Sequence, residues 1–285
     1  MKINPVLRKE LKLTVRTVKT SILLMVYAGI LAFVAVAMFA TITNSIRYGA
    51  SYSGYIALYG IIAGMQFGLI LFIVPAISSS SISGERERQT LEILLSTKLS
   101  PFSIISGKLM SSISKVILLV VSSIPIFAIV FLFGGVQAVH IVQLVLLYVV
   151  TVIYIGSIGI CLSTFFKSTK ASTAAAYGVV FALVLGTVFV TFIYFAFLES
   201  RAVGHGTAFK PFIPFFLYIN PGLGFASLIT NQIGGGNLFS LTGANNNSME
   251  YAWIINLIVE LVMSVLLIFV AAKKLNPIKK SKKVK

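Results

Sequence analysis

The sequence is poor in acidic residues and in cysteine. It has no aspartate, seven glutamates and one cysteine, and charged residues make up only 11% of its 285 positions. A single cysteine excludes an internal disulfide, and Cys161 lies in an apolar run where a small packing residue is expected. The chain also lacks a GxxxxGK(S/T) phosphate loop, an HExxH pair, a cysteine cluster and paired carboxylates. We therefore expect no catalytic site, no metal site and no cofactor on this chain.

Apolar residues, in contrast, are abundant. They form 58% of the sequence, which includes 22 phenylalanines and has a mean hydropathy of +0.99, and a soluble domain is far less apolar. A helix needs about 20 apolar residues to cross a bilayer. Six runs approach or exceed that length: 21–43, 56–82, 116–133, 141–166, 171–198 and 251–272. The predicted fold class is therefore an all-α membrane protein, with a six-helix transmembrane domain over residues 21–272.

The net charge of +16 comes mainly from short basic blocks that lie between the apolar runs. This distribution favours anionic lipid headgroups over nucleic acid as the partner. Of the 23 Lys and Arg residues, 20 fall in four segments that six crossings place on one side: 1–20, 86–115, 167–170 and the tail 273–285. Because cytoplasmic loops carry the excess of Lys and Arg, both termini are predicted in the cytoplasm and residues 199–250 outside.

Residues 1–20 are predicted to form an amphipathic helix at the cytoplasmic membrane interface. Asn4 and Pro5 provide an N-cap and first-turn pair. At about 100° per residue, two sets of side chains separate onto opposite arcs. One arc holds Leu7, Leu11, Thr14, Val15 and Val18, and the other holds Arg8, Lys9, Lys12, Arg16 and Lys19. A basic amphipathic helix that leads into an apolar span is typical of the membrane interface.

Two spans carry small residues at four-residue spacing, which favours close helix packing. These residues are Gly60, Gly64 and Gly68 in the second span and Ala174, Gly178, Ala182 and Gly186 in the fifth. In the long outer segment, the apolar pieces 209–218 and 222–229 are each too short to cross a bilayer. Since Asn220 and Pro221 separate them, we expect short re-entrant or interfacial helices outside, between the fifth and sixth spans.

Glu260 lies near the middle of the sixth span, where a charge is costly enough to suggest a functional site. Together with Gln66 of the second span it forms a candidate intramembrane polar site. The alternative is that Glu260 is a protonated or hydrogen-bonded packing residue, with Gln66 or Tyr154 as its partner. The sequence leaves both interpretations open.

Residues 84–101, GERERQTLEILLSTKLSP, form the longest polar, mixed-charge stretch between two apolar runs. Gly84 is expected to end the second span as a C-cap. Leu91, Leu94 and Leu95 then follow helical spacing. A short helix with a leucine ridge beside Glu and Arg is suited to dock into a groove on a soluble protein. The alternative is a helix that lies on the bilayer with its leucines in lipid.

The segment GERERQTLEILLSTKLSPFSIISGKL resembles the loop between the second and third spans of ABC-2 type transporter permeases. That loop typically has an acidic and basic run, Gly-Thr-Leu-Glu, a leucine pair, Thr-Pro-Leu-Ser and Gly-Lys; here Gln89 replaces the first glycine and Lys98 the proline. The opening NPVLRKELK and the order of the spans are also similar to this family. The resemblance implies a multi-pass permease of a bacterial cell membrane. It also implies pairing with a second permease subunit, the same or homologous, and with two separate ATP-binding subunits that hold ATP and Mg²⁺.

The resemblance further implies that residues 84–101 include the coupling helix that receives the ATPase stroke. The candidate coupling residues are Glu85, Arg86, Glu87, Arg88, Leu91, Glu92, Leu94 and Leu95. The predicted function is export of a hydrophobic or amphipathic substrate, such as a peptide, lipid or drug, by the permease subunit of an ATP-driven transporter. Two alternatives stay open: an ion-coupled secondary transporter, and a non-transporting membrane subunit of an ATPase complex.

Overall fold

The computed structural model describes residues 18–46, 53–96, 100–132, 136–205, 215–233 and 251–275. Most of the predicted interface helix 1–20 and of the basic tail 273–285 lies outside these residues. The described parts are helical and contain no strand. They include six helical spans that are long and apolar enough to cross a membrane. The predicted all-α membrane fold with six spans is therefore confirmed.

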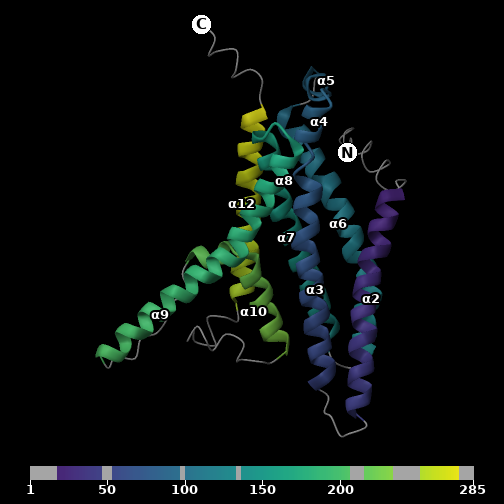
Figure 1. The fold of residues 1–285 in the computed structure, drawn as a ribbon, viewed down its shortest axis with the longest axis vertical. Coiled ribbons are helices and arrows are strands. Elements are labelled where there is room, and N and C mark those ends of the chain that lie inside the picture. The colour runs from purple at the N-terminus through teal and green to yellow at the C-terminus, as the bar shows by residue number, and fades with distance from the viewer. Residues whose placement is uncertain are drawn as a thin grey trace.

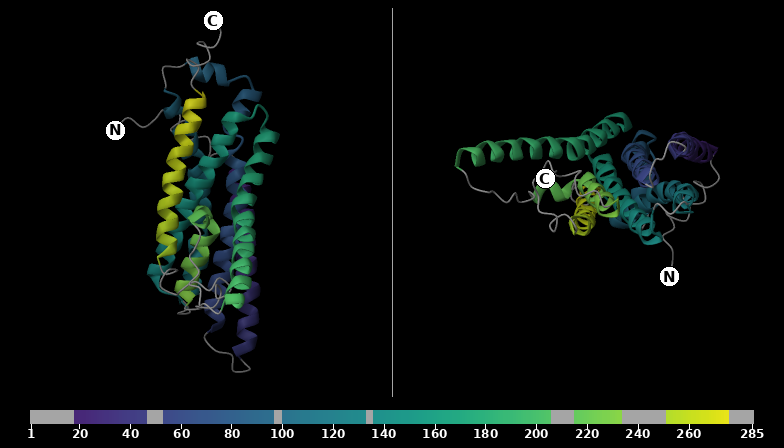
Figure 2. Two further views of the ribbon diagram at one scale, coloured as in Figure 1. Left: turned by 90° about the vertical axis from the view of Figure 1, so that its left-hand side faces the viewer. Right: turned by 90° about the horizontal axis from the view of Figure 1, so that it is seen from below.

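The spans form an elongated bundle (Figure 1, Figure 2). Five of them are α2 (Val18–Ile46), α3 (Ser53–Ser78), α6 (Pro101–Leu132), α7 (Ala138–Phe165) and α12 (Ala252–Leu275). The fifth in chain order joins α8 (Thr169–Phe181), the π-helix η1 (Ala182–Gly186) and α9 (Thr187–His205). Only residues 166–168 join α7 to α8, and Ser168 caps α8: its Oγ accepts a hydrogen bond from the Ala171 N–H at 3.3 Å.

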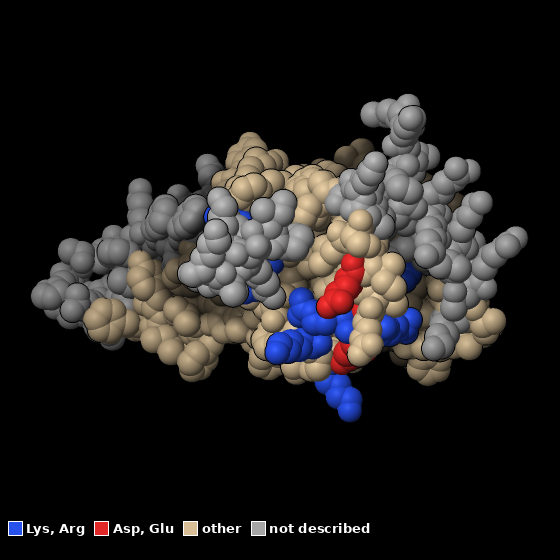
Figure 3. Space-filling view, turned by 90° about the horizontal axis from the view of Figure 1, so that it is seen from above, with Lys and Arg blue, Asp and Glu red and all other residues tan. Residues whose placement is uncertain are grey.

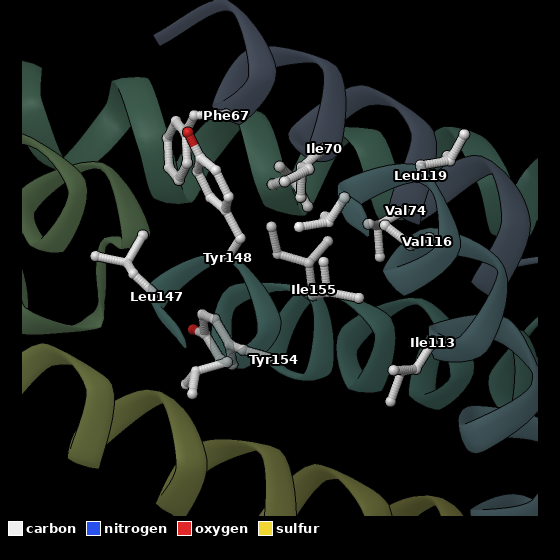
Figure 4. Close-up of a cluster of buried hydrophobic side chains, with 14 of the residues drawn as sticks. Phe67, Ile70, Val74, Ile113, Val116, Leu119, Leu147, Tyr148, Tyr154 and Ile155 are labelled. Carbon is white, nitrogen blue, oxygen red and sulfur yellow. The ribbon is translucent and has the colours of Figure 1, made fainter. Parts of the chain in front are cut away.

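The centre of the bundle is α7. In its most apolar stretch 78% of the residues are buried, against 11% in the corresponding stretch of α2. The helices α3, α6 and α12 pack around it. The core that they enclose contains Ile70, Val116, Leu147, Tyr148 and Ile155 (Figure 4). Because lipid tails are as apolar as these side chains, the bundle depends on close packing and on hydrogen bonds between helices.

Gly159 of α7 marks a close crossing with the end of α3. A Cβ at Gly159 would collide with the Ser78 hydroxyl and would lie 3.2 Å from the backbone nitrogen of Ser79. Any larger residue would push the two helices apart, so glycine is required here. The sequence pattern did not single out this position, because the requirement comes from a helix that lies about 80 residues away along the chain.

The two predicted small-residue faces differ in their packing. In the second span, a Cβ at Gly60 would lie 2.9 Å from Ile233 Cδ1, whereas nothing lies within 4 Å of one at Gly68. In the fifth span, nothing lies within 4 Å of a Cβ at either Gly178 or Gly186. The first face therefore packs closely at one end only, and these two glycines of the second face make no close contact in the described chain.

The fifth span bends at η1, and α9 leans away from the bundle beyond it (Figure 1). A π-turn disturbs the regular ladder of backbone hydrogen bonds. The Asn220 side chain fills this gap, since its Nδ2 donates to the Val184 carbonyl at 3.2 Å and to Thr187 Oγ1 at 2.8 Å. Asn220 thus ties the bend of the fifth span to the segment that precedes the sixth.

Two short helices flank Asn220, η2 (Phe215–Ile219) and α10 (Pro221–Ile233). The structure thus has short helices around the Asn-Pro pair, although the first apolar piece, 209–218, is described only from residue 215. α10 packs against α12, α7 and α3. The Phe225 ring of α10 stacks on the Phe67 ring of α3, with ring centroids 4.5 Å apart. This outer segment is therefore built into the bundle.

The segments predicted to face the cytoplasm share one end of the bundle (Figure 1). This end carries the beginning of α2, the end of α12, and the short helices α4 (Ser83–Glu87) and α5 (Leu91–Ser96). The turn between α7 and α8 lies there too, in contact with α4. Successive spans therefore run in opposite directions, as the predicted cytoplasmic position of these segments requires.

Candidate functional site

The polar segment between the second and third spans forms α4 and α5. α3 ends at Ser78, and the prediction that Gly84 ends this span is wrong, because Gly84 lies inside α4 and its N–H donates to the Ser80 carbonyl at 2.9 Å. Serine hydroxyls compete with the backbone for helical carbonyls. Ser78 Oγ donates to the Val74 carbonyl at 2.8 Å, and Ser83 Oγ donates to the Ser79 carbonyl at 3.0 Å. The serine run therefore loosens the helix before the glycine is reached.

Arg86 and Ser163 join α4 to the end of α7. Ser163 Oγ accepts from the backbone N–H groups of Ile82 and Ser83, at 2.9 and 2.8 Å. The Arg86 guanidinium donates to the carbonyls of Phe166 and Thr164, at 2.6 and 3.2 Å. Carbonyls at the end of a helix lack partners within the helix, and a cation is favoured there. Each segment thus satisfies backbone groups that the other leaves open.

Glu87 joins α4 to the start of α8. Its carboxylate accepts from the Thr169 backbone N–H at 2.7 Å and from the Thr169 hydroxyl at 2.9 Å. An acidic group at a helix N-terminus satisfies an open N–H and interacts favourably with the helix dipole. Glu87 therefore supplements the cap that Ser168 gives to the same helix.

Glu85 joins α4 to α6 and to its own turn. Lys108 Nζ lies 2.9 Å from Glu85 Oε1, in an ion pair whose side chains are 11% and 30% exposed, respectively. The Thr90 hydroxyl donates to the other oxygen of the same carboxylate. The Thr90 N–H donates to the Glu85 carbonyl at 3.0 Å. Glu85, Arg86 and Glu87 thus each hold a different span within the chain.

The residues of α5 divide into an inner and an outer face. Leu91 is buried in the core, and Leu94 and Leu95 pack half-buried against it. Glu92 and Ile93 are exposed, with 69% of Ile93 accessible. The leucine ridge, predicted to meet a partner or lipid, contacts the bundle instead. The leucine pattern did not single out Ile93, although its position two residues after Leu91 places it on the opposite face of a helix.

Charged side chains gather at this end of the bundle (Figure 3). The exposed ones include Glu87, Arg88, Glu92, Lys167 and Lys170. Between α4 and α5, Gln89 has a positive φ of 58°, a conformation that glycine adopts most easily. This is the position where ABC-2 type permeases typically have glycine, so the resemblance and the backbone geometry agree there.

No hydrogen bond joins the two predicted intramembrane residues in the described chain. Glu260 is fully buried, and its Oε2 accepts from the Thr151 hydroxyl at 3.2 Å. Gln66 is also fully buried, and neither of its amide atoms has a hydrogen-bond partner in the described chain. The Glu260 partner is therefore Thr151 rather than Gln66. The register of α12 against α7 decides this pairing, and hydropathy carries no information on that register.

A helical bundle of six apolar spans, with charged side chains gathered at the end that carries α4 and α5, defines a multi-pass membrane protein. The described residues contain no group of three His, Cys, Asp or Glu placed to hold a metal ion. The chain matches the family described as ABC-2 family transporter protein over residues 5–273, and it belongs to this family. It is therefore a permease subunit of an ABC transporter, a class that associates with ABC ATP-binding subunits. No curated protein matches the sequence.

Proposed function

We propose that this permease subunit belongs to an ATP-driven exporter and that the α4–α5 segment is its dock for a separate ATPase subunit. The observation that carries the proposal is the three-way anchoring of α4. Glu85 binds α6, Arg86 binds the end of α7, and Glu87 binds the start of α8. A displacement of this segment acts on three spans through direct contacts, which is what a coupling element requires.

The surface that remains free to bind the ATPase is the outer face of α5 and the residue Arg88 just before it. Arg88 and Glu92 are exposed there beside Ile93. An exposed apolar side chain flanked by charges is suited to fill a pocket on a partner, with the charges setting its orientation. In this proposal Leu91 and the anchoring charges transmit the displacement, while Ile93, Arg88 and Glu92 receive it.

The rest of the proposed complex follows the family resemblance. Two permease subunits pair, and two ATP-binding subunits hold ATP and Mg²⁺ on the cytoplasmic side. The spans then rock between two states that open the substrate site to one side of the membrane or the other. ATP hydrolysis shifts the balance between these states. The direction of transport, export, also follows the resemblance.

An apolar hollow supports a hydrophobic or amphipathic substrate. It lies between α2, α3 and α6 and has a volume of about 330 Å³. The residues that line it are Ala35, Val36, Phe39, Tyr55, Leu58, Ile126, Ile129 and Val130. Sites of this size and composition bind mainly by apolar contact, so the hollow suits a hydrocarbon chain better than a sugar.

The docking surface is tested with Ile93→Asp in the permease, expressed together with its ATP-binding subunit. We expect the amount of ATPase that copurifies to fall about tenfold or more, because a charge replaces the apolar anchor at the centre of the contact. Tyr251→Asp is the matched control, since Tyr251 is 60% exposed and directly precedes α12, at the other end of the bundle.

The Ile93→Asp comparison and two measurements on the wild type test the proposed function against its alternatives. If the Ile93→Asp complex assembles and hydrolyses ATP like the wild type, the docking assignment is wrong. If reconstituted wild-type permease transports its substrate without the ATPase, the chain is a secondary transporter. If no transported substrate stimulates ATP hydrolysis in the wild-type complex, the chain is a non-transporting subunit.

A further inference from the structure

One face of α12 is polar although it is enclosed by the bundle. Asn256, Glu260 and Ser264 follow one another at four-residue spacing, which places them on one side of the helix. They are 0%, 0% and 2% exposed. Ser264 donates to the Leu261 carbonyl of its own helix at 2.7 Å. The other two reach neighbouring helices, so the polar face has a role between elements.

The Asn256 side chain holds the outer helices in place. Its Nδ2 donates to the carbonyls of Tyr218 and Asn220, at 2.7 and 3.0 Å. A Cβ at Gly224 of α10 would lie 3.2 Å from Asn256 Cβ and would collide with the Asn256 amide, so α10 approaches α12 closely at this point. Asn256 therefore fixes the turn from which α10 begins.

Two enclosed oxygen atoms on this face lack a donor. Glu260 Oε2 accepts from Thr151, but Glu260 Oε1 and Asn256 Oδ1 have no hydrogen-bond partner in the described chain. Residues four apart on a helix have Cβ atoms about 5–6 Å apart. The two open acceptors thus belong to neighbouring residues of one helix face, and one additional donor placed between them would serve both. An enclosed acceptor that is left open destabilises the folded state.

The surroundings also lack a charge that would balance a Glu260 carboxylate. No ion pair involves Glu260 among the described residues. Of the helices packed against α12, α7 brings Tyr154 and η2 brings Tyr218, while α10 has no titratable residue. α6 brings Lys115, and Lys108, which pairs with Glu85. An unpaired carboxylate in a dry interior is strongly unfavourable.

A metal cation is a poor candidate for the missing positive charge. Hard cations of the Ca²⁺ and Mg²⁺ type take six or more oxygen ligands. The side-chain oxygens available on this face and at its partner are the carboxyl of Glu260, the amide of Asn256 and the hydroxyl of Thr151, which is too few. A proton needs only one acceptor, and once bound it also supplies the missing donor.

We propose that Glu260 is a proton-binding site: the folded protein holds it as a neutral acid whose Oε1–H donates towards Asn256 Oδ1, directly or through one water molecule. The proton then completes a hydrogen-bonded series from Thr151 through Glu260 and Asn256 to Asn220. That series links α7, α12, the start of α10 and the bend in the fifth span.

The proposal is tested by infrared spectroscopy of the purified full-length protein in lipid. The C=O stretch of a protonated carboxyl absorbs apart from the carboxylate and amide bands, and the chain has only seven glutamates and no aspartate. At neutral pH we expect a band that corresponds to one protonated carboxyl in the wild type and its complete loss in Glu260→Gln. Glu92→Gln, at an exposed site, should keep the band.

Further variants decide how the proton is held. Thr151→Val should shift the band without removing it, because the carboxyl loses one donor and keeps its proton. Lys115→Gln should leave it unchanged. Absence of the band in the wild type, or its persistence in Glu260→Gln, overturns the proposal. So does a wild-type band that appears only when sodium is removed, since a cation then neutralises the site. Where Glu260→Gln does not fold, the shifted band in Thr151→Val assigns the protonated carboxyl to Glu260, and an unshifted band there overturns the proposal.

Discussion

Neighbouring residues of the α4–α5 segment divide the tasks of anchoring and exposure. Glu85, Arg86 and Glu87 bind other helices, whereas Arg88 and Glu92 are exposed. Ion pairs at an exposed surface contribute only about 0–1 kcal/mol. Arg86 and Glu87 instead bind the open backbone groups of two helix ends, and hydrogen bonds of this charged type are stronger. Removing either residue would leave backbone groups of α7 or α8 without their partner.

Gln89 offers a test of backbone strain at the turn between α4 and α5. A side chain in the left-handed conformation costs about 1 kcal/mol or more, and glycine avoids that cost. Since Gln89 has a φ of 58°, Gln89→Gly should raise the midpoint of thermal unfolding in detergent by about 2–4 °C. Gln89→Ala is the control, because it removes the amide and keeps the Cβ. Equal midpoints in the two variants would show that the turn is not strained.

At the scale of elements, hydropathy predicted the spans but not their interruptions. A lipid-facing backbone must satisfy its own hydrogen bonds, so each long apolar run has to be helical. The break between α3 and α4 depends instead on serine hydroxyls, and the bend at η1 depends on Asn220, which lies 36 residues from Val184. The run ALVLG of η1 is as apolar as its surroundings. It therefore gives no local signal of a bend.

The position of the candidate site in the chain was predictable from the sequence, but the role of each of its residues was not. The mixed charges of residues 84–101 mark it in the sequence. The partners of these charges, however, come from distant parts of the chain, since Arg86 binds the Phe166 carbonyl and Glu87 binds Thr169. Composition and spacing describe one helix at a time. Which residues bind other helices and which stay exposed can be assigned only once the three-dimensional arrangement of the helices is known.

The bend in the fifth span is predicted to depend on the Asn220 side chain. Asn220→Ala removes its donors to Val184 and Thr187 and its acceptor for the Gly222 N–H, which lies 2.7 Å away. The Val184 carbonyl then lacks this donor in an apolar setting, at a cost of about 1–3 kcal/mol. We expect a lower thermal unfolding midpoint and faster hydrogen exchange in α9. Gln137→Ala, at an exposed position before α7 where the side chain makes no capping hydrogen bond, should change neither quantity.

At the scale of the whole molecule, the described helices and their charged side chains mark one end of the bundle. The charged end carries α4, α5 and the turn before α8, and there Lys274 of α12 lies over the Phe165 ring, 5.1 Å from its centroid. Basic residues near the end of a helix also interact favourably with its dipole. The opposite end carries the start of α12, where Tyr251 is exposed. This asymmetry is what the positive-inside rule requires of a cytoplasmic face.

The orientation in the membrane is predicted to place the α4–α5 end in the cytoplasm. Cys161 is the sole cysteine and is buried, so Cys161→Ala gives a background for single-cysteine labelling. On that background, Ser96→Cys in α5 should react with a membrane-impermeant thiol reagent only after the cells are opened. Tyr251→Cys should react in intact cells, because the start of α12 lies at the other end of the bundle. The reverse labelling pattern would place α4 and α5 outside, away from any cytoplasmic ATPase, and would refute both the orientation and the docking proposal.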